Sequence, residues 1–248
     1  MPFLTKVRSL TFYGLAALWT LGLSIPYLVL FLLPRRYLQN CGAFYCRGLL
    51  LLLRLTTGLS HEVRGLERLP PHPYLIAAKH QSAWETLALP TIVPRPSIVL
   101  KRSLYRIPVF GWYLRAAGMI GIDRRAGASA LRLMIAESRR ALADGRPVLM
   151  FPEGTRAAPD QHPPFPIGIT ALYENLKVPV VPVALNSGLF WPRESLAKLP
   201  GRIVVEFLPP IPPGLPRKEF SARLHEIINR ESDRLMAEAR AGRQPPDT

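Results

Sequence analysis

His80 and Glu85 are the two side chains in this sequence best suited to acid–base chemistry, and they follow an apolar run at 74–78 that is typical of a buried strand. On one α-helix, residues five apart point about 140° away from each other. They can therefore meet only if His80 lies on a loop and Glu85 lies in the first turn of the following helix. Ser82 supplies that break, because Ser82-x-x-Glu85 matches the capping-box pattern. With Ser82 as the N-cap, the Glu85 carboxylate would accept the imidazole N–H, fix its tautomer and raise its basicity.

A purely structural interpretation of this pair stays open at this point. Glu85 can close the helix cap without any part in chemistry. A single histidine at the end of a strand is commonly packed and hydrogen-bonded with no further role.

Cations and a glycine turn follow other predicted strands. Phe151–Arg156 follows an apolar run; Gly154 permits a tight turn there, and Arg156 can hold a phosphate with two parallel hydrogen bonds. Lys101 and Arg124 also stand just after apolar runs. Each cation alone is typical of a solvated surface. In open α/β sheets, however, ligands bind at the carboxyl ends of the strands, so three cations in such places favour an anion site.

Past residue 61, short apolar runs alternate with stretches of helical spacing, which predicts an α/β domain with a mixed, largely parallel sheet flanked by helices. Helical spacing is clear at 129–144 and again from Phe220 to Leu235. The predicted strands lie at 74–78, 97–100, 119–122, 148–151, 178–185 and 202–207.

The N-terminal segment has no charged residue between Leu10 and Leu33, a run long enough for a helix to cross a bilayer. Gly48–Leu53 is too short to span and is expected in the membrane interface or packed against the first helix. A buried helical hairpin is the alternative. Basic residues dominate the remaining chain, which predicts that it stays on the cytoplasmic side. We therefore expect membrane-anchoring helices at 1–60, the α/β domain at 61–240 and a flexible tail at 241–248.

Charge and cysteine content narrow the function classes. The 248 residues include 32 Lys and Arg against 17 Asp and Glu, a net charge of +15, which predicts a polyanionic partner. The basic residues are scattered and no aromatic stacking stripe is present, which argues against nucleic acid and for an anionic membrane. Cys41 and Cys46 have no partners at zinc spacing, so we expect reduced thiols and no metal site. A membrane-tethered phospholipid-binding module without chemistry is the rival class.

Four segments in order resemble the motifs of the glycerolipid acyltransferases, specifically the 1-acyl-sn-glycerol-3-phosphate acyltransferases. They are His80–Glu85, Gly118–Arg124 with Lys101 upstream, Phe151–Arg156 and Val180–Val183. The sequence departs from the family pattern at two positions. The acid of the first motif is usually Asp and is Glu85 here, and Ile167 stands where the family often has a lysine before a glycine.

The resemblance implies transfer of an acyl chain from acyl-CoA or acyl carrier protein to the 2-hydroxyl of lysophosphatidic acid, giving phosphatidic acid at the cytoplasmic face of the inner membrane. It implies that His80 removes the hydroxyl proton, that Glu85 steadies the imidazolium, and that no cofactor beyond the acyl donor is needed. Backbone N–H groups near Gly154 would face the oxyanion. An acceptor such as glycerol-3-phosphate or a lyso-amino-acid lipid is the alternative. The residues expected to hold the acceptor phosphate are Lys101, Arg124, Glu153, Gly154, Thr155 and Arg156.

Overall fold

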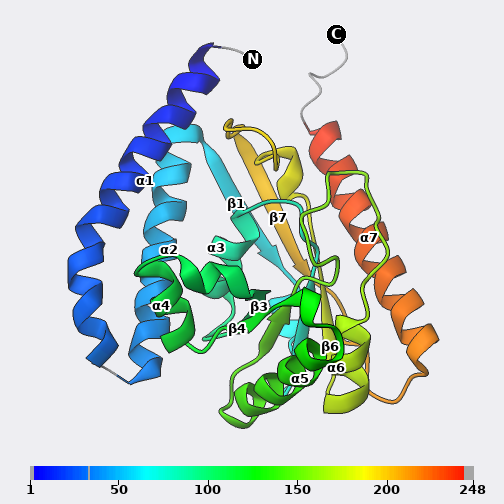
Figure 1. Ribbon diagram of the computed structural model, residues 1–248. Helices are drawn as coiled ribbons and strands as arrows, with labels where there is room; N and C mark the ends of the chain where they lie inside the picture. Colours follow the sequence, from blue (N-terminus) through cyan, green and yellow to red (C-terminus); the bar gives the residue numbers. More distant parts are fainter. Residues whose placement is uncertain (1–2, 33, 243–248) are drawn as a thin grey trace.

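The computed structural model describes residues 3–32 and 34–242, and its centre is one seven-stranded sheet with the strand order β1-β7-β6-β2-β5-β3-β4 (Figure 1). Apart from residues 241–242, the predicted C-terminal tail lies outside the described residues. The strands are β1 (Leu59–Arg64), β2 (Leu75–Ala78), β3 (Ser97–Lys101), β4 (Ile120–Ile122), β5 (Val148–Met150), β6 (Val180–Leu185) and β7 (Gly201–Phe207).

The sheet is mixed and largely parallel, as the sequence predicts. All neighbouring strands pair in parallel except β6 and β7, which run antiparallel with Val183 opposite Phe207. The strand β1 was not predicted, because Leu59 is its only fully buried side chain and polar residues fill most of its other positions. The expected domain boundary at residue 60 falls inside this edge strand.

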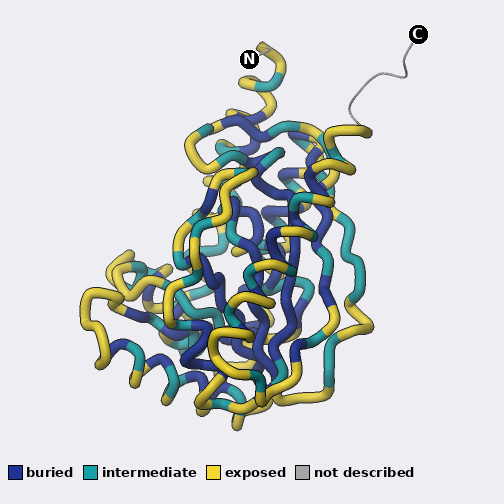
Figure 2. The backbone as a smooth tube through the Cα atoms, turned by 90° about the vertical axis from the view of Figure 1, so that its right-hand side faces the viewer, coloured by how far each residue is buried: buried dark blue, intermediate teal, exposed yellow. Residues whose placement is uncertain are grey.

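Helices cover both faces of the sheet because successive strand residues point to opposite sides. In β2, Ile76 and Ala78 pack in one buried cluster, with Trp84 of α3 (Trp84–Ile92). Leu75 and Ala77 pack in the other, with Met134 of α5 (Gly127–Ala143) and Phe220 of α7 (Arg217–Ala241). Figure 2 shows the buried backbone enclosed by exposed helices and loops. Two further helices, α4 (Phe110–Ala116) and α6 (Gly168–Leu176), follow β3 and β5 in the chain.

The N-terminal helices α1 (Phe3–Val29) and α2 (Arg35–Thr57) lie side by side at one edge of the molecule (Figure 1). Helix α1 is long and apolar enough to cross a membrane, and only 6% of its most apolar window is buried. Trp19 Nε1 donates to the carbonyl of Tyr45 at 3.2 Å, and a Cβ at Gly48 would come within 2.4 Å of the Trp19 ring. The short apolar stretch Gly48–Leu53 therefore belongs to α2 and packs against α1.

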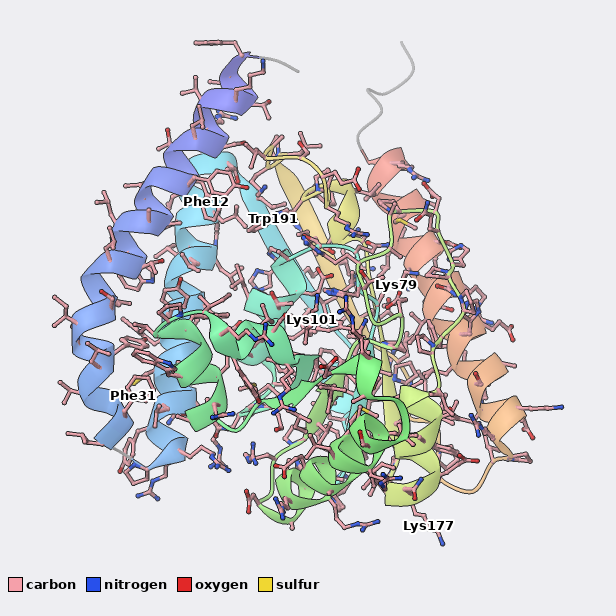
Figure 3. The ribbon with its side chains drawn as sticks, viewed as in Figure 1. Phe12, Phe31, Lys79, Lys101, Lys177 and Trp191 are labelled. Carbon is pink, nitrogen blue, oxygen red and sulfur yellow. The ribbon has the colours of Figure 1, made fainter. Side chains whose placement is uncertain are left out.

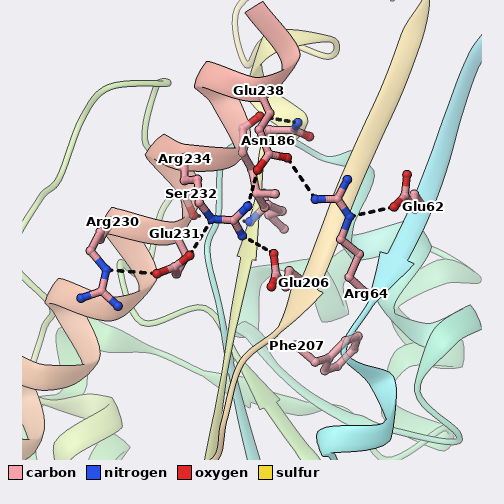
Figure 4. A network of polar contacts seen from close by, with 12 residues as sticks. Glu62, Arg64, Asn186, Glu206, Phe207, Arg230, Glu231, Ser232, Arg234 and Glu238 are labelled. Carbon is pink, nitrogen blue, oxygen red and sulfur yellow. Dashed lines mark hydrogen bonds and ion pairs between the residues drawn. The ribbon is translucent and has the colours of Figure 1, made fainter. Parts of the chain in front are cut away.

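A charged network joins α7 to the two strands at the β1 edge of the sheet (Figure 4). Arg234 pairs with Glu206 of β7 and with Glu238 on its own helix. Arg64 of β1 pairs with Glu238 at 3.0 Å and with Glu62 at 2.7 Å. An exposed ion pair alone stabilises little, but charges that share partners act together. The network fixes α7 along the sheet, and α7 in turn reaches the site described next.

Candidate active site

His80 and Glu85 meet on the loop between β2 and α3. The imidazole Nδ1 lies 2.9 Å from Glu85 Oε1, and the exposed fractions of the two side chains are 15% and 0%. An ionised carboxylate only accepts hydrogen bonds, so Nδ1 carries the proton and Nε2 is left with its lone pair. Nε2 has no partner among residues 3–32 and 34–242, and His80 lines the large pocket described below. The geometry leaves a free base at a pocket wall.

The Glu85 carboxylate also builds the turn on which His80 stands. Its Oε1 accepts the N–H groups of Gln81 at 2.7 Å and Ser82 at 2.6 Å. The Ser82 hydroxyl accepts the N–H of Trp84 at 3.1 Å, two residues ahead instead of the expected three. Helix α3 therefore begins one residue later than predicted, with Ala83 as its N-cap. Capping and orientation of the imidazole are done by the same carboxylate.

Ser187 supplies the fourth hydrogen bond to Glu85, and sequence analysis missed it. Its hydroxyl donates to Glu85 Oε2 at 2.8 Å, and Ser187 is fully buried. The only signal in the sequence was its place just after the apolar strand β6, at the sheet edge where chemistry is expected.

The predicted cations come together at the carboxyl ends of neighbouring parallel strands. Lys101 ends β3, Arg124 follows β4, and the turn with Gly154 and Arg156 follows β5. All four line one pocket with Thr155 and His80. Gly154 has φ +73°, a conformation that favours glycine, and a Cβ on it would lie 3.0 Å from the Arg124 guanidinium.

Glu153 is placed differently from the other residues predicted to hold a phosphate. Its side chain is 0% exposed, and its Oε1 forms an ion pair with Lys79 Nζ at 3.2 Å. Its Oε2 accepts the backbone N–H of His80 at 3.1 Å. Burial raises the pKa of Glu153, and the Lys79 ammonium opposes that rise. Lys79 also donates to Asn229 of α7 at 2.8 Å, so Glu153 joins the two motif loops to α7 and does not line the pocket.

In the turn after β5, some backbone N–H groups donate a hydrogen bond within the chain and others do not. The Gly154 N–H donates to the Phe151 carbonyl at 3.0 Å and is not available to a ligand. The N–H groups of Thr155 and Arg156 have no acceptor in the part of the chain that the structure describes. Any oxyanion contact from this turn therefore falls to those two amides.

The pocket has a volume of about 1180 Å³ and continues from the cations into an apolar region between the N-terminal helices and the sheet. Two of the residues that line it are labelled in Figure 3, Lys101 near the centre of the molecule and Phe31 beside the end of α1. Cys46 of α2 also lines it. Burial raises the pKa of Cys46 to about 12, so this thiol stays protonated and is a poor nucleophile.

A model of the Acyltransferase family matches residues 60–186, a span that contains the histidine–carboxylate pair and the cations at the strand ends. The chain is 40% identical over 211 residues to a 1-acyl-sn-glycerol-3-phosphate acyltransferase of Pseudomonas aeruginosa, covering 83% of this chain and 80% of that protein. It is 30% identical over 197 residues to 1-acyl-sn-glycerol-3-phosphate acyltransferase alpha of Mus musculus, covering 78% and 68%.

The chain therefore belongs to the acyltransferase family, within its 1-acyl-sn-glycerol-3-phosphate acyltransferase group. The fold agrees with the crystal structure of the 1-acyl-sn-glycerophosphate acyltransferase PlsC from Thermotoga maritima, with a TM-score of 0.76 at 22% identity. That alignment covers 94% of this chain and 96% of the other.

Proposed function

We propose that this enzyme transfers an acyl chain from acyl-CoA or acyl carrier protein to the 2-hydroxyl of lysophosphatidic acid, giving phosphatidic acid. The observation that carries the proposal is a free His80 Nε2 on the same pocket as Lys101, Arg124 and Arg156. A base and an anion site on one pocket suit an acceptor that has both a hydroxyl and a phosphate. The names of the relatives point to the same acceptor.

In the proposed reaction, Nε2 takes the hydroxyl proton while the oxygen bonds to the thioester carbonyl carbon. The tetrahedral intermediate then breaks its C–S bond, and the imidazolium returns the proton to the leaving sulfur, which departs as a free thiol. The Glu85 carboxylate steadies the imidazolium through the 2.9 Å contact. Positioned base catalysis of this kind contributes about a hundredfold to ten-thousandfold. No acyl-enzyme forms, so both substrates are bound together.

The acceptor phosphate is proposed to lie against Lys101, Arg124 and Arg156, which follow three strands and all line the pocket. Arginine suits this role because its planar fork makes two parallel hydrogen bonds to a phosphate. The amides of Thr155 and Arg156 are proposed to face the oxyanion of the intermediate.

The apolar part of the pocket is proposed to hold a fatty acyl chain. Its walls include Leu23 and Tyr27 of α1, Ala43 of α2 and Met134 of α5. A chain of methylene groups gains about 0.8 kcal/mol for each CH₂ taken out of water, which suits such a site.

We also propose that α1 anchors the enzyme in the inner membrane, with the α/β domain on the cytoplasmic face. Its exposed apolar side chains include Leu18, Leu21 and Ile25, and an anionic bilayer would complement the net charge of +15. The test is fractionation after alkaline extraction, combined with protease accessibility in spheroplasts. Release of the whole protein by alkali would contradict anchoring. A domain that resists added protease in intact spheroplasts, and is cleaved once their inner membrane is broken, would support the cytoplasmic side.

The activity is tested with one detergent-purified preparation, an acceptor panel and both donors. Lysophosphatidic acid, glycerol-3-phosphate and a lyso-amino-acid lipid are each supplied with acyl-CoA or acyl carrier protein, and free thiol is measured. We expect thiol release that depends on lysophosphatidic acid and is abolished by His80→Ala, with a thermal midpoint close to that of the wild type. A faster rate with another acceptor, or wild-type turnover without the imidazole, would refute the proposal.

A further inference from the structure

We propose that Ser187 is a positioning residue that sets the orientation of the His80–Glu85 pair by holding the second oxygen of the carboxylate. The inference deepens the proposed function, because it rests on His80 acting as the base. Ser187 lies outside the motif segments that the sequence singled out, and it does not line the pocket.

The two oxygens of Glu85 are held by different parts of the chain. Oε1 is bound by His80, Gln81 and Ser82, which all belong to the loop that Glu85 itself caps. Oε2 is bound by the Ser187 hydroxyl, 102 residues away in the sequence. A terminal carboxylate torsion has a broad energy profile, so bonds to one oxygen leave the group free to tilt. A donor at the other oxygen, on a separate loop, removes that freedom.

Ser187 is itself placed by the sheet. Strands β2 and β6 are parallel neighbours with Ala78 opposite Val183, so the loops that follow them leave the sheet side by side. The two loops are also joined by a hydrogen bond from the N–H of Gly188 to Gln81 Oε1 at 3.1 Å. The Ser187 carbonyl accepts the N–H of Trp191 at 2.9 Å, which fixes the start of the turn.

Burial makes this contact consequential. Ser187 and Glu85 are both fully buried, so water cannot replace the lost donor when the hydroxyl is removed. Hydrogen bonds to ionised groups in such surroundings are about twice as strong as neutral ones.

The test compares Ser187→Ala and Ser187→Cys with Ser138→Ala in the full-length enzyme. Ser138 is also fully buried, and its hydroxyl has no partner among the described residues, so it is a matched control. For Ser187→Ala we expect kcat to fall by roughly tenfold, the size of a lost hydrogen bond to a charged group. We expect the KM for lysophosphatidic acid to stay within about twofold, because the phosphate ligands are untouched. Ser187→Cys, a weaker donor, should be intermediate, and Ser138→Ala should match the wild type.

One readout separates positioning from mere structural support. In the Glu85→Gln background, the effect of Ser187→Ala on kcat should largely disappear, because the residue acts through Glu85. The same loss of kcat in both backgrounds would overturn the proposal.

A spectroscopic arm does not depend on turnover. The chain has five histidines, so ¹⁵N-histidine NMR of the protein in detergent can follow the His80 Nδ1–H signal, assigned by its loss in His80→Ala. We expect this signal to shift in Ser187→Ala and to stay in place in Ser138→Ala. An unshifted signal with wild-type kcat would overturn the inference. A shifted signal in an enzyme inactive on every acceptor would instead refute the proposed function and leave the Ser187 contact standing.

Discussion

The imidazole of His80 lies stacked on the ring of Phe151, with the ring centroids 4.1 Å apart and the planes 19° from parallel. Phe151 is the first residue of the third motif, and His80 belongs to the first. The flat contact limits rocking of the imidazole, while the bond from Nδ1 to Glu85 fixes its rotation in its own plane. Two motifs that are remote in sequence therefore determine together where Nε2 points.

Replacing Phe151 by Leu removes the stacked partner and keeps an apolar side chain. A stacked ring pair is worth about 0.5–1.5 kcal/mol, so we expect kcat to fall by roughly twofold to tenfold. Phe207→Leu makes the same change at a fully buried core position and should lower stability without changing kcat. Steady-state kinetics with chemical denaturation of both variants checks this, and equal kcat losses in the two would count against the stacking role.

The carboxylate of Glu85 can be tested by Glu85→Gln and Glu85→Asp. The amide can still accept the N–H groups of Gln81 and Ser82 but cannot balance an imidazolium, so kcat should fall by about two orders of magnitude or more. We expect the shorter Asp not to reach both His80 and Ser187, the two partners at either oxygen of Glu85, so this variant should also lose activity. Turnover and the thermal midpoint are measured for each. Near-normal turnover of Glu85→Gln would make Glu85 a structural cap only.

The buried ion pair of Lys79 and Glu153 should contribute to the free energy of unfolding. Lys79→Met leaves a buried carboxylate without its cation, at an expected cost of about 3–5 kcal/mol. Adding Glu153→Gln removes the charge and keeps an acceptor for the His80 N–H, so the double variant should recover most of the loss. Denaturant unfolding measures both. Glu153→Gln alone should leave the KM for the acceptor within about twofold, whereas a large rise would place Glu153 on the phosphate.

Gly154→Ala should weaken acceptor binding. A left-handed backbone costs an L-residue about 1–2 kcal/mol, and the new Cβ would crowd the Arg124 guanidinium at 3.0 Å. We expect the KM for lysophosphatidic acid to rise by roughly tenfold, with a smaller change in kcat. Gly145→Ala is the control, because it also has a positive φ, +69°, but nothing lies within 4 Å of its Cβ. A KM rise of the same size in the control would refute the Arg124 explanation.

Lys198 should make stability depend on pH. Its ammonium lies over the rings of Tyr13 and Trp191, at 5.0 and 4.4 Å, and burial lowers the pKa of Lys198 to about 8. Between a pH of about 8 and the ordinary lysine pKa of 10.5, Lys198 is protonated in the unfolded chain but not in the folded one. The free energy of unfolding should therefore rise with pH across this window. Subtracting the free energy of unfolding of Lys198→Met from that of the wild type at each pH isolates the contribution of Lys198. A difference that does not change with pH would contradict the prediction.

Local patterns in the sequence were enough to predict six strands, the helices at 129–144 and in the C-terminal stretch, and the His80–Glu85 contact. Apolar periodicity and capping chemistry act over a few residues, and they survive in the fold because burial in the sheet reinforces them. The edge strand β1 escaped prediction because its residues are mostly polar, and its position depends on pairing with β7.

The sequence by itself determined which side chain is the candidate base and which cations follow the strands, since these depend on residue type and on the order of strand and loop. Only the tertiary structure decided that Glu153 pairs with Lys79 and lies away from the pocket. It also decided that Ser187 holds Glu85. Both contacts join segments that are far apart in the chain. The order of the strands across the sheet decides which buried polar groups meet at the strand ends, and no local sequence pattern encodes that order.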